Sequence, residues 1–369
     1  MSWRAWAQAE CAGIRAAGEW RELRTFDGDG ITGRLAAADG EVVSFASNDY
    51  LGLSTHPAVV SAAQDAAGRW GAGAGSARLI VGSRPVHAEL EAALAAWKDC
   101  EAALLFPTGF AANLSVLSVV GVAGVTILSD ELNHASIIDG CRLARARVRV
   151  YRHRDLDHLS ALLAETTRAV VVTDTVFSMD GDVADVAALA ETCARNRALL
   201  VVDEAHAVLG PDCDLQGVEV LRVGTLSKFL GSLGGFVAGS RPLVELLVNR
   251  ARPFIFTTAP TPADAAAALT ALRIFRSDVG AALRARLRHH VDRLRPGHPS
   301  PIVPVVLGEE EAAVAAARAL LAHGIHVPAI RPPTVPPGTS RLRVTLSAAH
   351  SDDQVTALLG ALHEVHVAA

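Results

Sequence analysis

Lysine is almost missing from this sequence. The chain contains 34 lysine and arginine residues, and only Lys98 and Lys228 among them are lysines. A guanidinium stays protonated at any physiological pH, whereas a lysine ammonium can lose its proton and attack a carbonyl carbon. Lys228, within GTLSKFLGSLGG (224–235), is therefore a candidate nucleophile. The alternative is that this lysine is a chance remnant.

Runs of one charge, paired cysteines and long apolar segments are missing as well. The formal net charge is -5 without a basic stripe, which excludes the usual nucleic-acid binder. The 5 cysteines include no CxxC pair, so we expect neither a disulfide framework nor a metal site. Scattered, unpaired cysteines are typical of a reducing compartment, so we expect a cytoplasmic protein. The N-terminus lacks a signal-peptide core, and the longest apolar stretch, 114–128, is too short to span a membrane.

Short β-branched runs alternate with Ala/Leu-rich helical segments in the middle of the chain. Strands are predicted at 102–106, 125–129, 148–152, 169–174, 198–204, 220–224 and 234–239. Continuous apolar strands separated by helices predict an α/β fold with a mostly parallel seven-stranded sheet, buried on both faces. An α+β pattern follows, with strands near 302–308, 324–330 and 341–347 and a Pro-rich loop at 331–341.

The motif VVDEAH places Asp203 and His206 just after a predicted buried strand. Ligands of parallel sheets bind at the carboxyl ends of the strands, so these two side chains are candidates for a site. The alternative for Asp203 is that it caps the following helix. The letters DEAH also resemble a nucleotide-hydrolysing motor, but the chain has no GxxxxGK[ST] motif, which excludes that class.

Three other segments could contribute to the same site. Thr108, Gly109 and Phe110 join a strand to a helix, and the N-terminus of a helix binds phosphate; an ordinary tight turn is the alternative. His134 follows another strand, although a lone histidine is more often structural or exposed. Arg343 lies on the same face of a predicted strand as Arg341, where it could bind a carboxylate or simply face solvent.

Together these residues match what pyridoxal 5'-phosphate (PLP) requires. Its aldehyde needs a lysine, its pyridine nitrogen needs an acid that keeps it protonated, and its phosphate needs a helix N-terminus. The order of the residues in the sequence does not establish this by itself.

Seven segments, taken in order, resemble the α-oxoamine synthases, a family of PLP-dependent enzymes. They are SNDYLGLSTHP (47–57), FPTGFAAN (106–113), LNHASIIDG (132–140), DTVFSMDGD (174–182), VVDEAH (201–206), GTLSKFLGSLGG (224–235) and RPPTVPPGTSRLRVTLSAAH (331–350). The resemblance extends from about residue 15 to 365. It implies PLP-dependent transferase fold type I, the fold of aspartate aminotransferase. The segment 331–343 is most similar to members that condense L-alanine with a pimeloyl thioester.

The resemblance assigns roles to individual residues. Lys228 would bind the cofactor aldehyde and later move the α-proton, Asp203 would pair with the pyridine nitrogen, His206 would bind the ring hydroxyl and His134 would stack on the ring. The remaining cofactor residues would be Thr108, Gly109, Phe110, Ser178, Thr225, Thr257 and Thr258. The substrate-binding residues would be Arg21, Asn48, His134, Arg331, Thr334 and Arg343.

The family also implies a homodimer whose active sites are shared, with Thr257 or Thr258 reaching the neighbouring subunit's phosphate. The acyl donor would be pimeloyl-CoA or a pimeloyl-acyl-carrier protein. The alternatives are another substrate pair, such as glycine with acetyl-CoA or succinyl-CoA, and a PLP-binding protein without turnover.

The expected organisation has three parts: an N-terminal helical arm with short strands (1–45), a large PLP-binding α/β domain (46–260) and a C-terminal α+β domain (261–369). One departure from the family pattern is AHAVLGPDCDLQGVEV (205–220), which is several residues shorter than usual. The shorter segment leaves open the local packing and the entry of the acyl substrate.

Overall fold

The computed structural model describes residues 1–36, 38, 40–210, 215 and 217–367. The segment 205–220, which departs from the family pattern, therefore lies partly outside the described residues. Contacts divide the chain into a larger unit, residues 47–303 and 345–352, and a smaller unit, residues 1–46, 304–344 and 353–369. The domain limits expected at 46 and 260 stay a prediction.

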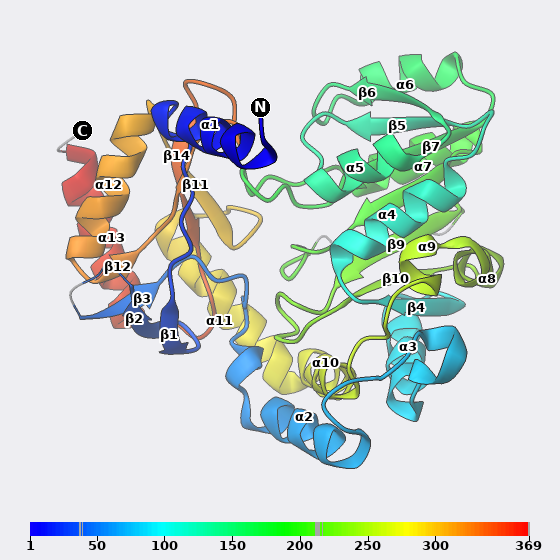
Figure 1. Cartoon of the computed structure of the whole chain (residues 1–369), viewed down its shortest axis with the longest axis horizontal. Helices are drawn as coiled ribbons and strands as arrows, with labels where there is room; N and C mark the ends of the chain where they lie inside the picture. The colour runs from blue at the N-terminus through cyan, green and yellow to red at the C-terminus, as the bar shows by residue number, and fades with distance from the viewer. Residues whose placement is uncertain (37, 39, 211–214, 216, 368–369) are drawn as a thin grey trace. The chain divides into compact units, whose positions relative to one another are not determined.

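The larger unit is built on a seven-stranded sheet with the order β4-β10-β9-β8-β7-β5-β6 (Figure 1). Only β10 runs antiparallel to its neighbours, β4 and β9. The mostly parallel seven-stranded sheet expected from the sequence is confirmed. Its strands are β4 (Ala102–Phe106), β5 (Thr126–Asp130), β6 (Arg147–Tyr151), β7 (Ala169–Asp174), β8 (Leu199–Asp203), β9 (Val220–Thr225) and β10 (Gly235–Gly239).

Among the described residues, two helices precede this sheet, four connect its strands, and four follow β10. They are α2 (Pro57–Trp70), α3 (Pro85–Trp97), α4 (Gly109–Val120), α5 (Ala135–Leu143), α6 (Leu156–Ala164), α7 (Val186–Asn196), α8 (Arg241–Arg250), α9 (Arg252–Ile255), α10 (Pro262–Phe275) and α11 (Asp278–Leu294). Proline occupies the first turn of five of these helices, α2, α3, α8, α9 and α10, where its missing N–H costs no intrahelical bond.

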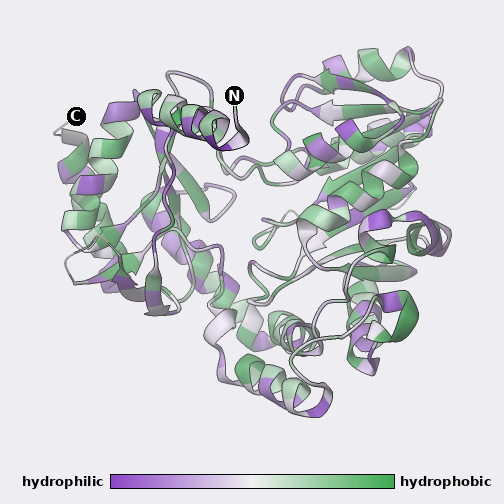
Figure 2. Ribbon diagram, viewed as in Figure 1, coloured by the Kyte–Doolittle hydropathy of each residue, from purple (hydrophilic) through white to green (hydrophobic). Residues whose placement is uncertain are grey.

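Alternate residues of the central strands pack into two separate cores. Val170 and Val172 of β7 lie in one cluster with Leu117 of α4, while Val171 lies in the other with Leu189 of α7. Side chains of a strand alternate between its faces, so an uninterrupted apolar run fills both cores at once. Figure 2 shows the strands of this sheet largely in the hydrophobic colour. Rigid packing on both faces fixes the ends of the strands.

The smaller unit has two sheets, β1-β2-β3-β12 and β11-β14-β13. Its strands are β1 (Phe26–Asp29), β2 (Thr32–Leu35), β3 (Glu41–Ser44), β11 (Ile302–Gly308), β12 (Ile325–His326), β13 (Ala329–Ile330) and β14 (Ser340–Thr345), and its helices are α1 (Trp3–Ala16), α12 (Glu310–Ala322) and α13 (Asp352–Val367). The prediction of a single strand at 324–330 is wrong, because this segment forms two short strands, β12 and β13, that belong to different sheets. Pro328, which has no N–H to donate, lies between them.

No helix among the described parts of the chain has both the length and the apolar character needed to cross a membrane.

His153 ties the end of β5 to the loop that follows β7. Its Nδ1 lies 2.9 Å from Asp130 Oδ1 and its Nε2 lies 2.8 Å from Asp182 Oδ2. Its ring also packs edge-on against Phe177, with the centroids 4.3 Å apart. Burial opposes protonation of the imidazole, but the hydrogen bonds and charges of the two aspartates outweigh it and raise the pKa of His153 to about 9. A protonated His153 therefore holds the segment that contains Ser178.

We expect the stabilisation by His153 to be lost in alkaline solution. Its folded pKa of about 9 lies above the ordinary value of 6.5, so the stabilisation is complete below pH 6.5 and disappears as the pH rises through 9. The substitution His153→Gln should lower the free energy of unfolding by on the order of 2 kcal/mol at pH 6, and by much less at pH 10. Urea unfolding at both pH values measures this.

The control for this comparison is His323→Gln, because the side chain of His323 is 57% exposed and lies 3.8 Å from Glu364. It should leave the stability unchanged within about 0.5 kcal/mol at either pH. An effect of His153→Gln that is equal at pH 6 and pH 10 would contradict the charged bridge.

Candidate active site

Lys228 lies in the turn after β9, and its amino group meets a histidine from the neighbouring strand end. Its Nζ is 2.8 Å from His206 Nε2. The turn needs Gly231, whose φ is 61° and whose Cβ would approach Ser54 N to 2.3 Å. The side chain of Lys228 is half-buried, and the lysine selected from the sequence therefore lies beside His206, as expected for one site.

Tyr50 holds the other nitrogen of His206. Its hydroxyl lies 2.5 Å from His206 Nδ1 and donates to Asn48 Oδ1 at 3.1 Å. Tyr50 is fully buried, and Ala348 N donates to its carbonyl oxygen at 2.8 Å. The chain of contacts Asn48, Tyr50, His206 and Lys228 thus brings together three candidates from the sequence through a residue, Tyr50, that was not selected.

Asp203 ends β8 with a buried carboxylate, 6% exposed. Its Oδ1 accepts from Ala205 N at 2.9 Å, and its Oδ2 accepts from Asn113 Nδ2 at 2.6 Å. Residues 204–210 contain turns and no helix, so the alternative that Asp203 caps a helix is wrong. These two donors fix the orientation of the carboxylate at the end of β8.

A second carboxylate, Asp174, faces Asp203 across neighbouring parallel strands, since the two residues are paired in register. Asp174 Oδ2 accepts from the backbone N–H of His134 at 2.7 Å. Burial first, and then the charge of Asp203, raise the pKa of Asp174 well above its ordinary value, against the bond from His134 and the charge of Lys228. This pair places His134, the N-cap of α5, beside the strand ends.

The start of α4 forms the candidate phosphate site. Thr108 is the N-cap, and its side chain accepts from Ala111 N, so the N–H groups of Gly109 and Phe110 open the helix. A Cβ on Gly109 would come within 3.4 Å of Thr225 Cβ, so a side chain there would narrow the space between helix and strand. Thr225 ends β9, and its Oγ1 lies 2.7 Å from Ser227 Oγ. The helix end expected from the sequence is present.

Ser178, Thr257 and Thr258 lie on connecting segments of the larger unit. Ser178 follows Phe177 in a turn that needs Gly181, where a Cβ would approach Ile302 O to 1.9 Å. Thr257 and Thr258 come after α9, and Ala259 N, next to them, donates to Ser76 O at 3.0 Å. The roles of these three residues remain proposals.

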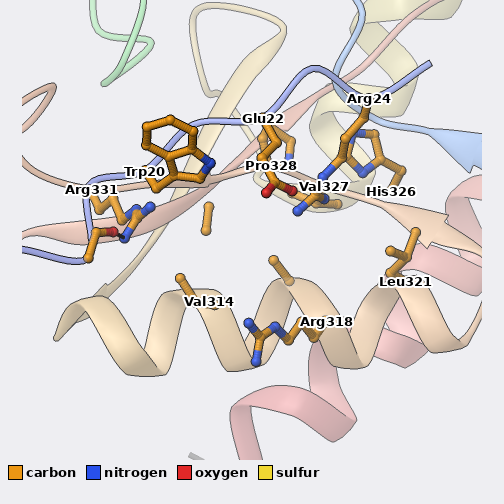
Figure 3. A pocket seen from close by; sticks show the side chains of 13 residues that line it. Trp20, Glu22, Arg24, Val314, Arg318, Leu321, His326, Val327, Pro328 and Arg331 are labelled. Atoms are coloured by element: carbon orange, nitrogen blue, oxygen red, sulfur yellow. Dashed lines mark hydrogen bonds between the residues drawn. The ribbon is translucent and has the colours of Figure 1, made fainter. Parts of the chain in front are cut away.

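The remaining substrate candidates belong to the smaller unit. Arg343 on β14 is 6% exposed, as Arg341 is at 5%, so the alternative that these arginines face solvent is wrong. Arg21 and Thr334 are exposed. Arg331 donates to Gly18 O and lines a cavity of about 530 Å³ between the N-terminal segment and α12 (Figure 3).

Comparisons with known proteins agree with this geometry. Residues 40–362 match the family model for aminotransferase class I and II. An 8-amino-7-oxononanoate synthase of Methylobacterium sp. (strain 4-46) is 50% identical, over 100% of this chain and 98% of that protein. The chain belongs to the class I and II aminotransferases, within their α-oxoamine synthase group.

Solved structures of this group share the fold. Serine palmitoyltransferase of Sphingomonas wittichii is 30% identical, with a TM-score of 0.89 over 98% of this chain and 96% of its own. An 8-amino-7-oxononanoate synthase from Francisella tularensis is 27% identical, with a TM-score of 0.74 over 88% of this chain and 98% of its own. The transferase fold implied by the sequence resemblance is confirmed.

Sequence reasoning missed several polar residues that build this α-oxoamine synthase site: Tyr50, Asn113, Ser136 and Asp174. Each is 4% exposed or less, and each hydrogen-bonds to a candidate or to its backbone. The available signal was a polar residue within an apolar segment, as with Asn113 in α4. Such residues are buried with partners, and the partners lie elsewhere in the chain.

Glu204, the residue after Asp203, forms ion pairs with two cations and so stabilises the end of β8. Its Oε2 lies 2.6 Å from Lys98 Nζ and its Oε1 lies 2.6 Å from Arg222 Nη1. Burial would raise the pKa of Glu204, but the two cations outweigh it and hold that pKa below the usual range. The second lysine of the sequence, Lys98, is therefore structural.

Removing the charge of Glu204 should be costly, because it leaves two buried cations without their counter-ion. We expect Glu204→Gln to lose about 3 kcal/mol of stability at pH 7. A lowered folded pKa contributes stability above the unfolded value and loses it as the pH falls, so the difference from the wild type should shrink below pH about 4. Urea unfolding across this pH range is the measurement.

Glu191→Gln provides the matched control, since Glu191 is 74% exposed and lies 3.8 Å from Arg195. We expect it to change the stability by less than about 0.5 kcal/mol. Equal effects of the two substitutions would show that the buried ion pairs do not support this strand end.

Proposed function

We propose that this protein is an 8-amino-7-oxononanoate synthase of biotin biosynthesis. L-alanine and a pimeloyl thioester would give 8-amino-7-oxononanoate, carbon dioxide and the free carrier thiol. The observation that carries the proposal is the contact of 2.8 Å between Lys228 and His206 beside the buried Asp203. It occurs in a chain that is 50% identical over its whole length to a synthase of that name.

The residues of the larger unit fit PLP as the cofactor. The amine after β9, the buried carboxylate at the end of β8 and the helix N-terminus after β4 lie at the same edge of the sheet. The small Gly109 leaves open the space beside Thr225 that a Cβ would narrow. Thr108, Gly109, Phe110 and Thr225 would hold the phosphate, with Ser178 close to the ring. When bound, PLP supplies an aldehyde that takes up amines covalently and a ring that accepts electrons from the adjacent carbon.

Lys228 would serve first as the amine that holds the cofactor and then as the base. Its amino group must lose a proton for either task, and His206 Nε2, 2.8 Å away, can accept a hydrogen bond from it. After the amino group of alanine replaces it, Lys228 would take the proton from the α-carbon and later return one to the product. His206 would also bind the ring hydroxyl.

Asp203 and His134 would act on the cofactor ring. The carboxylate of Asp203 would keep a proton on the pyridine nitrogen, because a nearby negative charge favours the protonated form. The donors Ala205 N and Asn113 Nδ2 keep this carboxylate oriented. His134 would stack on the ring.

Two groups of residues would bind the two substrates. Arg343 and Asn48 would bind the carboxylate of alanine, and Arg21, Arg331 and Thr334 would line the path of the acyl chain. The acyl carrier is coenzyme A or an acyl-carrier protein, and the protein would act in the cytoplasm. The second candidate function is that of another α-oxoamine synthase, joining glycine to an acetyl or succinyl thioester.

The active unit would be a homodimer with shared sites. Next to the segment of Thr257 and Thr258, the side chains of Phe256, Ile80 and Val81 are 69%, 74% and 67% exposed. Apolar groups of this size concentrated on one segment and its neighbour are typical of a surface that a partner covers. Thr257 or Thr258 would then reach the phosphate held by the other subunit.

The first test uses Lys228→Ala, with Lys228→Arg as the matched variant that keeps the positive charge. Both should abolish the visible absorbance of lysine-bound PLP and lower thiol release from pimeloyl-CoA with L-alanine by about three orders of magnitude. An arginine variant that retains activity would refute a nucleophilic role for Lys228.

The same assay, with glycine and acetyl-CoA or succinyl-CoA, distinguishes the two candidate functions. Faster thiol release with either of these pairs would replace the alanine reaction with the second candidate. A third result is that the protein binds PLP at its lysine and yet releases no thiol from any donor, carrier-protein thioesters included. That result would identify it as a cofactor-binding protein without turnover.

The dimer proposal is tested by complementation. Co-expressed Lys228→Ala and Thr257→Val/Thr258→Val subunits should form mixed dimers with one native site, restoring about a quarter of the wild-type activity per total site. Each variant alone should stay far below that level. If every site belongs to one chain, mixing will restore nothing, and size-exclusion chromatography will show whether a dimer forms at all.

A further inference from the structure

Asn113 is a buried polar residue in the mostly apolar helix α4, and its side-chain amide contacts residues of two other segments. Its side chain is 1% exposed, and buried residues around it in α4 include Ala112, Val116 and Leu117. Its Nδ2 donates to Asp203 Oδ2 at 2.6 Å and to Ser136 Oγ at 2.9 Å. An apolar residue would be less costly to bury at this position, so its two hydrogen bonds call for a function.

The orientation of this amide follows from Asp203. The atom of Asn113 that lies 2.6 Å from the carboxylate must be the nitrogen, because an amide oxygen there would face a second oxygen without a hydrogen between them. The same nitrogen contacts Ser136 Oγ. Ser136 Oγ therefore receives a hydrogen from Asn113 and retains its own to donate.

The hydrogen of Ser136 Oγ has an acceptor in His134. The hydroxyl oxygen lies 2.7 Å from His134 Nδ1, and Ser136 N also donates to that nitrogen, at 3.2 Å. Two donors directed at Nδ1 need its lone pair. A proton on Nδ1 would remove the acceptor of Ser136 N and reverse the bond with Ser136 Oγ, so the neutral ring that serves both donors carries its hydrogen on Nε2.

We propose that Asn113 and Ser136 are positioning residues that hold His134 as the neutral tautomer with its hydrogen on Nε2, through a hydrogen-bonded chain that also orients Asp203. The catalytic consequence rests on the proposed function, whereas the tautomer is a property of the protein alone. A neutral His134 avoids repulsion with a protonated cofactor ring and keeps Nε2–H available as a donor.

The titratable and charged groups around His134 are consistent with a neutral ring. Asp174 of β7 binds its backbone N–H, Asp203 ends β8, Lys228 lies in the turn after β9, and the ring of Phe110 from α4 is 6.4 Å away, edge-on. The loss of surrounding water lowers the pKa of His134, Asp203 opposes this and Lys228 adds to it. The net direction is downward, towards the neutral form.

The test is nitrogen NMR of the full-length protein labelled with 15N-histidine, first without PLP. The resonances of His134, one of 14 histidines, are assigned by their loss in His134→Gln. The wild type should show a bare Nδ1 and a protonated Nε2 from pH 6 to pH 9. A protonated Nδ1, or a charged ring at pH 7, would overturn the proposal without any further variant.

Ser136→Ala should raise the pKa of His134 by about one unit, because it removes a bond that favours the neutral form. Ser136→Thr, which keeps the hydroxyl, should restore the wild-type titration. Ser115→Ala is the matched control, since Ser115 is also a buried serine but donates to Ala111 O at 2.7 Å within its own helix. If Ser136→Ala and Ser115→Ala give the same titration as the wild type, the chain does not act on His134.

Asn113→Ala should affect both ends of the chain. We expect it to raise the pKa of His134 and to weaken PLP binding about tenfold, because Asp203 loses one of its donors. Ser136→Ala should lower kcat while leaving PLP affinity unchanged. Weaker PLP binding in Asn113→Ala with unchanged His134 resonances would break the proposed link. If the wild type has the expected tautomer but releases no thiol from any donor, the proposed function fails and this inference stands.

Discussion

The burial of two facing carboxylates is the constraint on which the site depends. Asp174 and Asp203 end adjacent parallel strands in register, and neither is more than 6% exposed. Buried carboxyl groups need hydrogen-bond donors, and here the donors come from the segments that carry the functional groups: His134 N for Asp174, and Ala205 N with Asn113 Nδ2 for Asp203. Satisfying these carboxylates therefore places the loops around them.

Much of the scaffold could be predicted, because its determinants are local. The run AVVVTD (169–174) is apolar at consecutive positions, and such a run forms a strand buried on both faces wherever it lies in the chain. The same applies to Lys228, since its chemistry distinguishes it from 32 arginines, the remainder of the 34 basic residues after the two lysines. A nucleophile can be selected by residue type before its surroundings are known.

The supporting polar residues could not be predicted, because their roles depend on partners brought together by the fold. Tyr50 and His206 are 156 positions apart in the sequence, and Asn113 and Asp203 are 90 apart. Arg341 and Arg343 are two residues apart, so alternation places both on one face of β14 and cannot distinguish them. Burial does not distinguish them either, since every residue of that strand is buried. The strand predicted at 324–330 was divided by Pro328, whose effect depends on which sheet each half joins.

The chain of bonds from Asp203 through Asn113 and Ser136 to His134 has an evolutionary consequence. Residues in one hydrogen-bond network interact non-additively, with coupling of about 0.5–3 kcal/mol. We therefore expect the effect of a change at 113 to depend on which residue occupies 136. For the same reason, we expect the four positions to vary together among relatives, even though they lie on separate segments of the chain.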